Sequence, residues 1–221
     1  MKNKETKILV VIGAVVIALG ALIAMVYKSS SGQAADEESG ANDRISNEQL
    51  LREGAHTKGS MTAKVRIVEF LDPECESCAA MHPYVKQLLK EFPQVALTVR
   101  YMPFHGNSVF AASLLEAAAL EDKYWQLMEA LFHYQSEWAS HHDPKPEKAY
   151  DIAQQIGMDA EKLRKTVLEK KDEFAELIEK DRLAGMALGV RGTPTFFVNG
   201  KLLQSLGYDS LKEAIEEELK R

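Results

Sequence analysis

Cysteine is scarce in this chain of 221 residues, which contains only two, Cys75 and Cys78. Two cysteines are too few for a disulfide-stapled mini-protein or for a four-thiolate zinc site. A basic excess is also missing, because 27 lysines and arginines stand against 33 acidic residues and leave a net charge of −6. This balance argues against a nucleic-acid partner, which normally requires a basic face. No repeat with a period of about 20–50 residues occurs, which argues against a repeat solenoid.

A long apolar run stands near the start of the chain. Residues 8–27 carry no charge and as a helix would extend about 30 Å, the thickness of the hydrocarbon core of a bilayer. Lys2, Lys4 and Lys7 precede the run, so the positive-inside rule predicts that residues 1–7 are cytoplasmic and the rest is extracytoplasmic. We therefore predict a single-pass signal-anchor. The alternative is a secreted protein with a cleaved signal peptide, although the apolar core of such peptides usually spans about 7–15 residues.

The next segment differs sharply in composition. Residues 28–45 are small, polar and acidic, without an apolar period, and are typical of a flexible linker. Residues 46–221 then have the size of a single domain. Apolar residues make up 46% of the whole chain, which is enough to bury a core and excludes wholesale disorder.

The folded unit opens with a strand, a helix and a second strand. Residues 64–71 are short, β-branched and nearly all apolar, which is typical of a strand buried on both faces. A helical stripe of apolar residues follows from Cys75 to Phe92, and residues 95–101 alternate as a second strand. This order predicts a βαβ unit with a parallel pair of strands.

The pattern between about residues 105 and 190 is helical, and the β pattern then returns. A strand at 195–198, a hairpin turn at 199–200 and a short returning strand are predicted. The last helix is predicted to begin at Ser210, with Glu213 completing a capping box. The predicted fold class is therefore α/β, with a βαβ half and a ββα half separated by an inserted helical subdomain.

The two cysteines form the motif Cys75-Glu76-Ser77-Cys78 directly after the first strand. A helix that begins at or just after Cys75 places the first sulfur at a helix N-terminus, where unpaired amides and the macrodipole favour the reactive thiolate. Cys78 lies one turn further in and can attack a mixed disulfide formed at Cys75. The spacing predicts thiol–disulfide exchange.

Two other interpretations of the pair stay open. A structural disulfide would close so small a loop that it would stabilise the fold weakly. A copper or zinc site would use Cys75, Cys78 and His82, but a fourth ligand is not apparent. In that case the chain would be a non-catalytic metal-binding protein.

These features resemble the thioredoxin superfamily, and within it the DsbA-like branch of extracytoplasmic disulfide oxidoreductases with a helical insertion. Four matches carry the resemblance: the cysteine motif after a buried strand, Pro83 in the following helix, Glu69 in the strand, and the loop Gly192-Thr193-Pro194-Thr195. The resemblance covers residues 57–221. It implies a thioredoxin fold, with a helical insertion at about residues 105–190, behind the predicted transmembrane helix.

The resemblance also implies an activity. It indicates a thiol–disulfide oxidoreductase with Cys75 as the nucleophile and Cys78 as the resolving thiol. Its substrates would be cysteine-containing proteins, and a membrane redox partner would reset the pair. The resemblance implies neither a dissociable cofactor nor a bound metal. Whether the chain oxidises, reduces or isomerises its substrates stays open.

Three further residues receive roles through the resemblance. Glu69 shares strand parity with Ile67 and Leu71, so it is expected to be buried. Burial raises the pKa of a carboxyl group, which would let Glu69 accept a proton from Cys78 and return it later. Thr193 and Pro194 match a cis-proline loop. If the bond is cis, the Thr193 backbone faces the sulfurs and can pair with an extended substrate segment.

The motif departs from DsbA proper, which has a histidine between its cysteines. This chain has Glu76 there, with Asp72 and Glu74 nearby. These negative charges are expected to disfavour the Cys75 thiolate and to lower the reduction potential. We therefore expect a milder oxidant than DsbA, or even a reductant. His105 and the pair at positions 141–142 are expected to be surface or loop residues.

Overall fold

The computed structural model describes residues 44–60 and 62–221. The predicted cytoplasmic segment 1–7, the transmembrane helix 8–27 and nearly all of the linker 28–45 lie outside the described residues. Among the helices that are described, none is both long and apolar enough to span a bilayer.

A mixed sheet forms the centre of the described domain, with the strand order β1-β3-β2-β4-β5. β2 (Val65–Leu71) and β3 (Val95–Tyr101) run parallel, and every residue of both strands is buried. Burial on both faces was predicted for β2, whereas the alternating pattern of β3 did not indicate it. β4 (Thr195–Val198) is antiparallel to β2, and β5 (Lys201–Leu202) returns from it through a hairpin. β1 (Thr57–Lys58) pairs with β3 at the other edge and has no counterpart in the sequence prediction.

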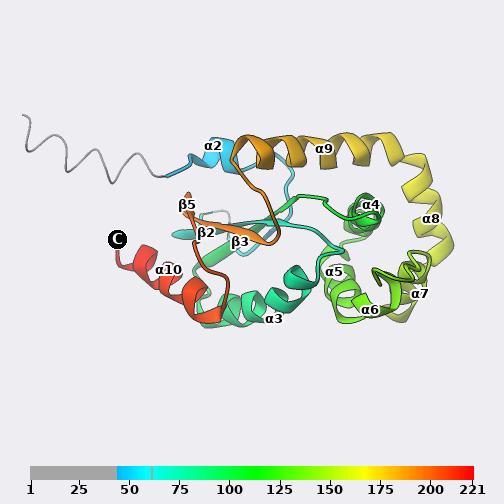
Figure 1. Cartoon of the computed structure of the whole chain (residues 1–221), viewed down its shortest axis with the longest axis horizontal. Helices are drawn as coiled ribbons and strands as arrows, with labels where there is room; N and C mark the ends of the chain where they lie inside the picture. The colour runs from blue at the N-terminus through cyan, green and yellow to red at the C-terminus, as the bar shows by residue number, and fades with distance from the viewer. Residues whose placement is uncertain (1–43, 61) are drawn as a thin grey trace, which may run out of the picture. The chain divides into compact units, whose positions relative to one another are not determined.

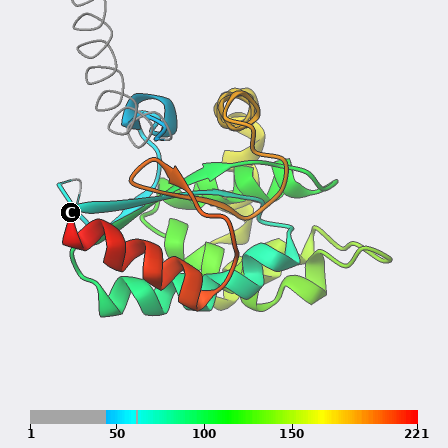
Figure 2. The ribbon, with the colours of Figure 1, turned by 60° about the vertical axis from the view of Figure 1, so that its left-hand side comes forward.

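Helices cover both faces of this sheet. Figures 1 and 2 show α3 (Glu76–Glu91) and α10 (Tyr208–Lys220) on one face, with α2 (Asn47–Leu50) and α9 (Lys171–Ala187) on the other. α10 begins at Tyr208 rather than at Ser210, so the predicted capping box is wrong. The reason is Gly207, whose φ of 149° suits glycine and whose carbonyl oxygen accepts the first helical hydrogen bond, from Leu211.

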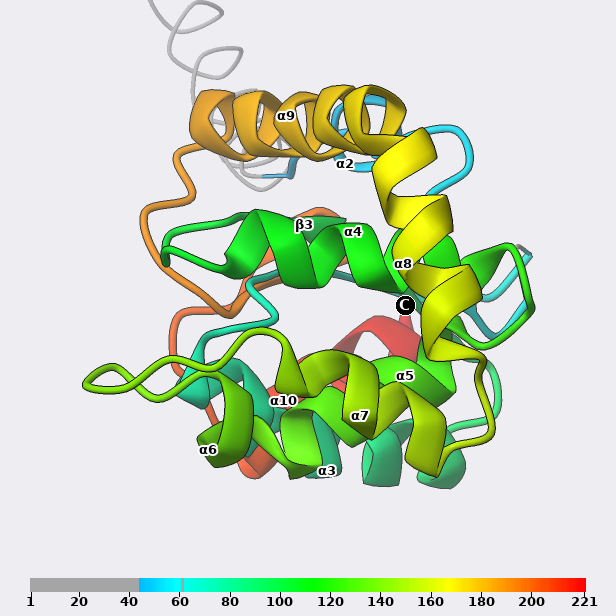
Figure 3. The same cartoon turned by 90° about the vertical axis from the view of Figure 1, so that its right-hand side faces the viewer.

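A helical block separates the two halves of the sheet, as predicted. It contains α4 (Ser108–Ala119), α5 (Tyr124–His133), α6 (Gln135–Trp138), α7 (Lys148–Gln155) and α8 (Ala160–Glu169), and α9 leads back to β4. Figure 3 shows α4 between α9 and the pair α5 and α7. The βαβ, helical block and ββα order of the sequence prediction is confirmed.

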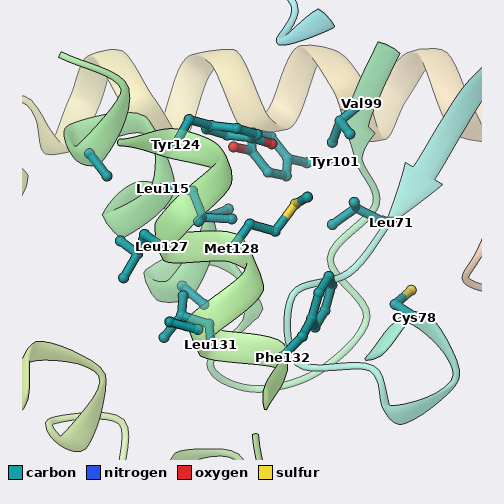
Figure 4. Packing of buried hydrophobic residues seen from close by; sticks show 14 of the residues in the cluster. Leu71, Cys78, Val99, Tyr101, Leu115, Tyr124, Leu127, Met128, Leu131 and Phe132 are labelled. Atoms are coloured by element: carbon teal, nitrogen blue, oxygen red, sulfur yellow. The ribbon is translucent and has the colours of Figure 1, made fainter. Parts of the chain in front are cut away.

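The block and the sheet share one apolar core. Met128 and Phe132 of α5 point toward Leu71 at the end of β2, and Cys78 lies beside them (Figure 4). The motif that contains Cys75 and Cys78 therefore packs between the sheet and the helical block. A small shift of the sheet or of the block would move the sulfurs.

A buried ion-pair network attaches α9 to the sheet. The carboxylate of Asp181 is fully buried and pairs with the guanidinium groups of Arg100 on β3 and of Arg52. It also accepts the backbone N–H of Tyr101 at 3.1 Å. Because the buried carboxylate pairs with two guanidinium groups and a backbone N–H, its burial is compensated by hydrogen bonds and opposite charge. The network orients α9 and hence the chain that leads from it to Thr193.

Candidate active site

The two sulfurs lie where the sequence predicts. Cys75 is the N-cap of α3, and its carbonyl oxygen accepts the backbone N–H of Ala79 at 3.1 Å. Both cysteines are free thiols. Cys75 keeps 8% of its surface exposed, whereas Cys78 is completely buried. Of the two, only Cys75 offers a path for attack by another thiol.

Hydrogen bonds around Cys75 favour its thiolate. The protonated thiol donates to the backbone carbonyl oxygen of Thr193 at 3.3 Å, a bond that the thiolate cannot make, whereas a hydrogen bond from the Thr193 side chain favours the thiolate. The pKa of Cys75 is lowered to about 5, first because the Cys78 thiol hydrogen-bonds to it. Burial opposes this effect, but further bonds from Thr193 and from the backbone N–H groups of Ser77 and Cys78 outweigh it.

The acidic residues near the motif do not prevent this lowering, although the pKa stays above the value of about 3.5 of DsbA. Each of the three carboxylates is held by a donor from a distant segment. Asp72 accepts the backbone N–H of Phe104 at 2.7 Å, and Glu74 accepts that of Asn107 at 2.6 Å. The Glu76 carboxylate lies 2.6 Å from Nε2 of His141. The sequence analysis treated these groups as free charges, whereas the fold supplies each one with a donor.

Cys78 and Glu69 form a buried acid pair behind Cys75. Burial, then the hydrogen bond to Cys75, then the charge of Glu69 raise the pKa of Cys78 far above its ordinary value. Glu69 is 3% exposed, as its strand parity predicts, and burial raises its pKa to about 8. Near neutral pH both groups therefore hold their protons, which leaves Cys75 as the one ionised thiol of the pair.

The loop before β4 completes the site. The Thr193–Pro194 peptide bond is cis, and the Thr193 carbonyl oxygen meets the Cys75 sulfur. The structure therefore places Thr193 of this loop against Cys75, and Glu69 beside Cys78 in the same core. Thr193 and Pro194 lie in the loop that contacts Cys75, and Glu69 lies close enough for its charge to act on Cys78.

His105 and His141 lie in loops, as expected, but the sequence did not indicate their carboxylate partners near the motif. His105, which we expected to be a surface or loop residue, has its Nδ1 2.8 Å from an oxygen of the fully buried Asp72. His141, placed in a solvated loop, pairs with Glu76. A useful signal was available for Asp72, because it directly follows the buried strand that leads into the motif.

His82, the third ligand of the alternative metal site, does not lie with Cys75 and Cys78 around a common centre. Its ring packs against Phe132 with ring centroids 5.3 Å apart, and burial lowers its pKa to about 4. Within residues 44–60 and 62–221, no three His, Cys, Asp or Glu side chains are placed to hold a metal ion.

Comparison with known proteins agrees with this geometry. A family model described as Thioredoxin matches residues 52–217. The chain belongs to this thioredoxin family. Disulfide bond formation protein D of Bacillus subtilis is 29% identical over 191 residues, which cover 81% of this chain and 83% of that protein. The expected thioredoxin fold is confirmed.

Solved structures give the same result. The crystal structure of oxidised BdbD from Bacillus subtilis matches with a TM-score of 0.69 and 30% identity, over 81% of this chain and all of that one. The thiol-disulfide exchange protein alpha-DsbA2 of Wolbachia pipientis matches with a TM-score of 0.65 and 26% identity, over 77% and 90% of the two chains. The resemblance to the DsbA-like branch is confirmed.

Some relatives are much longer proteins. The Na(+)/H(+) antiporter NhaA 3 of Salinispora tropica is 31% identical over 149 residues, which are 66% of this chain but 22% of the antiporter. The chain thus spans less than a quarter of such relatives, and the similarity concerns one segment of them.

Proposed function

We propose that this chain is an extracytoplasmic thiol–disulfide oxidoreductase that exchanges disulfides with cysteine-containing proteins. The observation that carries the proposal is the contrast between the two thiols: Cys75 with a pKa lowered to about 5, and Cys78 fully buried with a raised pKa. One thiol is the reactive thiolate near neutral pH, and the other is shielded within a turn of it. This asymmetry is what directed exchange requires.

The exchange conserves electrons and protons. A substrate thiolate attacks Cys75 of the oxidised pair, forms a mixed disulfide and releases Cys78 as a thiolate. Glu69, protonated because of its pKa of about 8, gives its proton to Cys78. A second substrate thiolate then attacks the mixed disulfide, the substrate leaves with a disulfide, and Cys75 leaves as a thiolate. Two electrons have passed from the substrate to the pair.

The direction of net transfer follows from the Cys75 thiolate. Stabilising the thiolate stabilises the reduced form, which makes the disulfide a stronger oxidant. A pKa of about 5 lies between those of thioredoxin, about 7, and DsbA, about 3.5. We therefore propose a disulfide donor milder than DsbA rather than a reductant. The Bacillus relative is named for disulfide bond formation, which supports this direction.

The proposed setting is the outer face of a membrane. The apolar run 8–27 would anchor the chain, and the linker 28–45 would let the domain reach its substrates. A membrane partner would accept the two electrons and restore the disulfide. Secretion after signal cleavage stays the alternative. Protease protection of the domain in intact cells tests on which side of the membrane the domain lies.

The test is an equilibrium with glutathione. The full chain, in detergent, is incubated in buffers of graded glutathione redox ratio, and the pair is trapped by acid and scored by thiol labelling. We expect a reversible two-electron transition at a potential between about −270 and −120 mV, the values of thioredoxin and DsbA. A Cys75→Ser variant should show none. Absence of a transition in the unmodified chain would overturn the proposal.

A further inference from the structure

His105 is fixed beside the redox motif by a buried carboxylate. Its Nδ1 lies 2.8 Å from an oxygen of Asp72, and its backbone N–H donates to the same oxygen at 3.3 Å. The Asp72 side chain is fully buried, whereas 28% of the His105 side chain is exposed. Because two bonds from one residue converge on one oxygen, the position of the imidazole ring is well defined.

Asp72 also contacts both cysteines through its backbone. Its carbonyl oxygen accepts the N–H of Cys75 at 3.1 Å, and its own N–H points to the Cys78 sulfur at 3.5 Å. Asp72 therefore links His105 to the backbone of Cys75 and to the sulfur of Cys78, although His105 follows Cys75 by 30 positions in the sequence. After the hydrogen bond and the charge of Asp72, the charge of the Cys75 thiolate is a further cause that raises the pKa of His105.

We propose that His105 is a positioning residue whose cationic ring, held by Asp72, stabilises the Cys75 thiolate. This inference rests on the proposed function and deepens it. DsbA proper, in the resemblance above, has a histidine between its cysteines, whereas this chain has Glu76 there. His105 supplies a positive charge to the same thiolate from the loop between β3 and α4.

The groups that face His105 determine when its ring is charged. Burial by itself would lower the pKa of His105, but the hydrogen bond to Asp72 and the charges of Asp72, Cys75 and Glu74 raise it overall. The ring of His141, from the loop after α6, lies 5.6 Å from the His105 ring between centroids, and its Nε2 pairs with Glu76. The carboxylate of Glu76 thus lies against the imidazole ring that neighbours His105.

The two titrations overlap in a defined interval. The Cys75 thiolate forms above about pH 5, and His105 keeps its proton to a pH above its ordinary value of about 6.5. Both charges are present in this interval and attract each other. Above it the ring is neutral, and its stabilisation of the thiolate is lost.

A His105→Gln variant tests the inference. Glutamine can still reach Asp72 but carries no charge. We expect the ratio of thiolate to thiol at Cys75, measured by thiolate absorbance near pH 5, to fall about tenfold, the effect of one pKa unit. The glutathione equilibrium at pH 6 should shift about fivefold toward the disulfide for the same one-unit change in pKa, and the shift should vanish by pH 9. An unchanged titration, or a shift that persists at pH 9, would overturn the inference.

Two variants control the experiment. His105→Arg keeps the charge at every pH, so it should restore the thiolate and its effect should persist at pH 9. His142→Gln removes an exposed histidine from a neighbouring loop and should titrate as the unmodified chain does. If the unmodified chain does not equilibrate with glutathione, the proposed function fails. If it does and His105→Gln behaves identically, only this inference fails.

A measurement on the unmodified chain covers the case in which the variant does not fold. By reciprocity, a Cys75 thiolate that is stabilised by His105 must also stabilise the protonated ring. The His105 resonance in NMR spectra should therefore titrate at a higher pH in the reduced protein than in the oxidised one. Equal midpoints in the two redox states contradict the inference.

Discussion

Asn107 holds both carboxylate oxygens of Glu74. Its backbone N–H donates to Oε2 at 2.6 Å, and its side-chain amide donates to Oε1 at 2.8 Å. Asn107 is the N-cap of α4, so the residue that precedes the nucleophile is bonded to the first helix of the inserted block. This contact fixes the redox loop to the block and satisfies a buried carboxylate.

Removing the Glu74 carboxylate should therefore cost stability. In Glu74→Ala two donors of Asn107 lose their acceptor at a buried position, and we expect the free energy of unfolding to fall by about 1–3 kcal/mol in urea titrations. Glu76→Ala is the matched control, because its side chain is 64% exposed and should change stability by less than about 0.5 kcal/mol. Equal losses in both variants would contradict the importance of this contact.

The two thiols should differ in reactivity. In the reduced protein, iodoacetamide should modify Cys75 at a rate that follows its thiolate, with a midpoint near pH 5 instead of the ordinary value of about 8.5. Cys78 should stay unmodified until the protein is unfolded, because it is fully buried and its pKa is raised. Peptide mass spectrometry after alkylation at several pH values measures both.

The Cys75→Ser variant isolates the buried thiol. It should take up no label in the native state and one label per chain in denaturant. Rapid native labelling of Cys78, or a Cys75 midpoint near pH 8, would show that the two environments are not as different as the structure indicates.

Local sequence patterns were enough to predict the positions of the two cysteines and of the strand and loop residues near them. The helix N-terminus at Cys75 follows from the strand and stripe on either side of it, and the burial of Glu69 follows from strand parity with Ile67 and Leu71. Such inferences succeed because they use spacings within one element. β1 was not predicted because a strand of two residues is too short to show an alternating pattern.

The charge around Cys75 could not be predicted in this way. The effect of an acidic side chain depends on its partner, and the partners of Asp72 and Glu74 are His105 and Asn107, about thirty residues further along the chain. Only the packing of α4 against the redox loop brings them together. A count of nearby charges therefore does not give the pKa of Cys75, which depends also on the donors that each carboxylate meets.

Glu69 makes the stability of the reduced protein depend on pH. Its pKa is about 8 in the folded protein and about 4.3 when unfolded, so the folded state binds the proton more tightly. The contribution of Glu69 to the free energy of unfolding is fully present below about pH 4. It is lost as the pH rises toward 8, and the free energy of unfolding falls by no more than about 1.4 kcal/mol per pH unit. Glu69→Gln should be as stable as the unmodified protein near pH 4 and more stable by several kcal/mol at pH 8.5.

The same variant should be slower in exchange. Glutamine cannot take the proton of Cys78, so the attack of Cys78 on a mixed disulfide at Cys75 should slow within pH 5–9. The slowing should be largest near and above pH 8, where the Glu69 carboxyl is ionised and the Cys78 thiol is not. Stopped-flow measurement of the release of a thiol bound to Cys75 gives this rate. If the variant is more stable at high pH but resolves the mixed disulfide more slowly, Glu69 is a proton carrier that lowers the stability of the fold. A residue with only a packing role would not change the resolution rate in this way. A resolution rate that does not change across this pH range would exclude Glu69 from proton transfer, even if the stability curve behaves as expected.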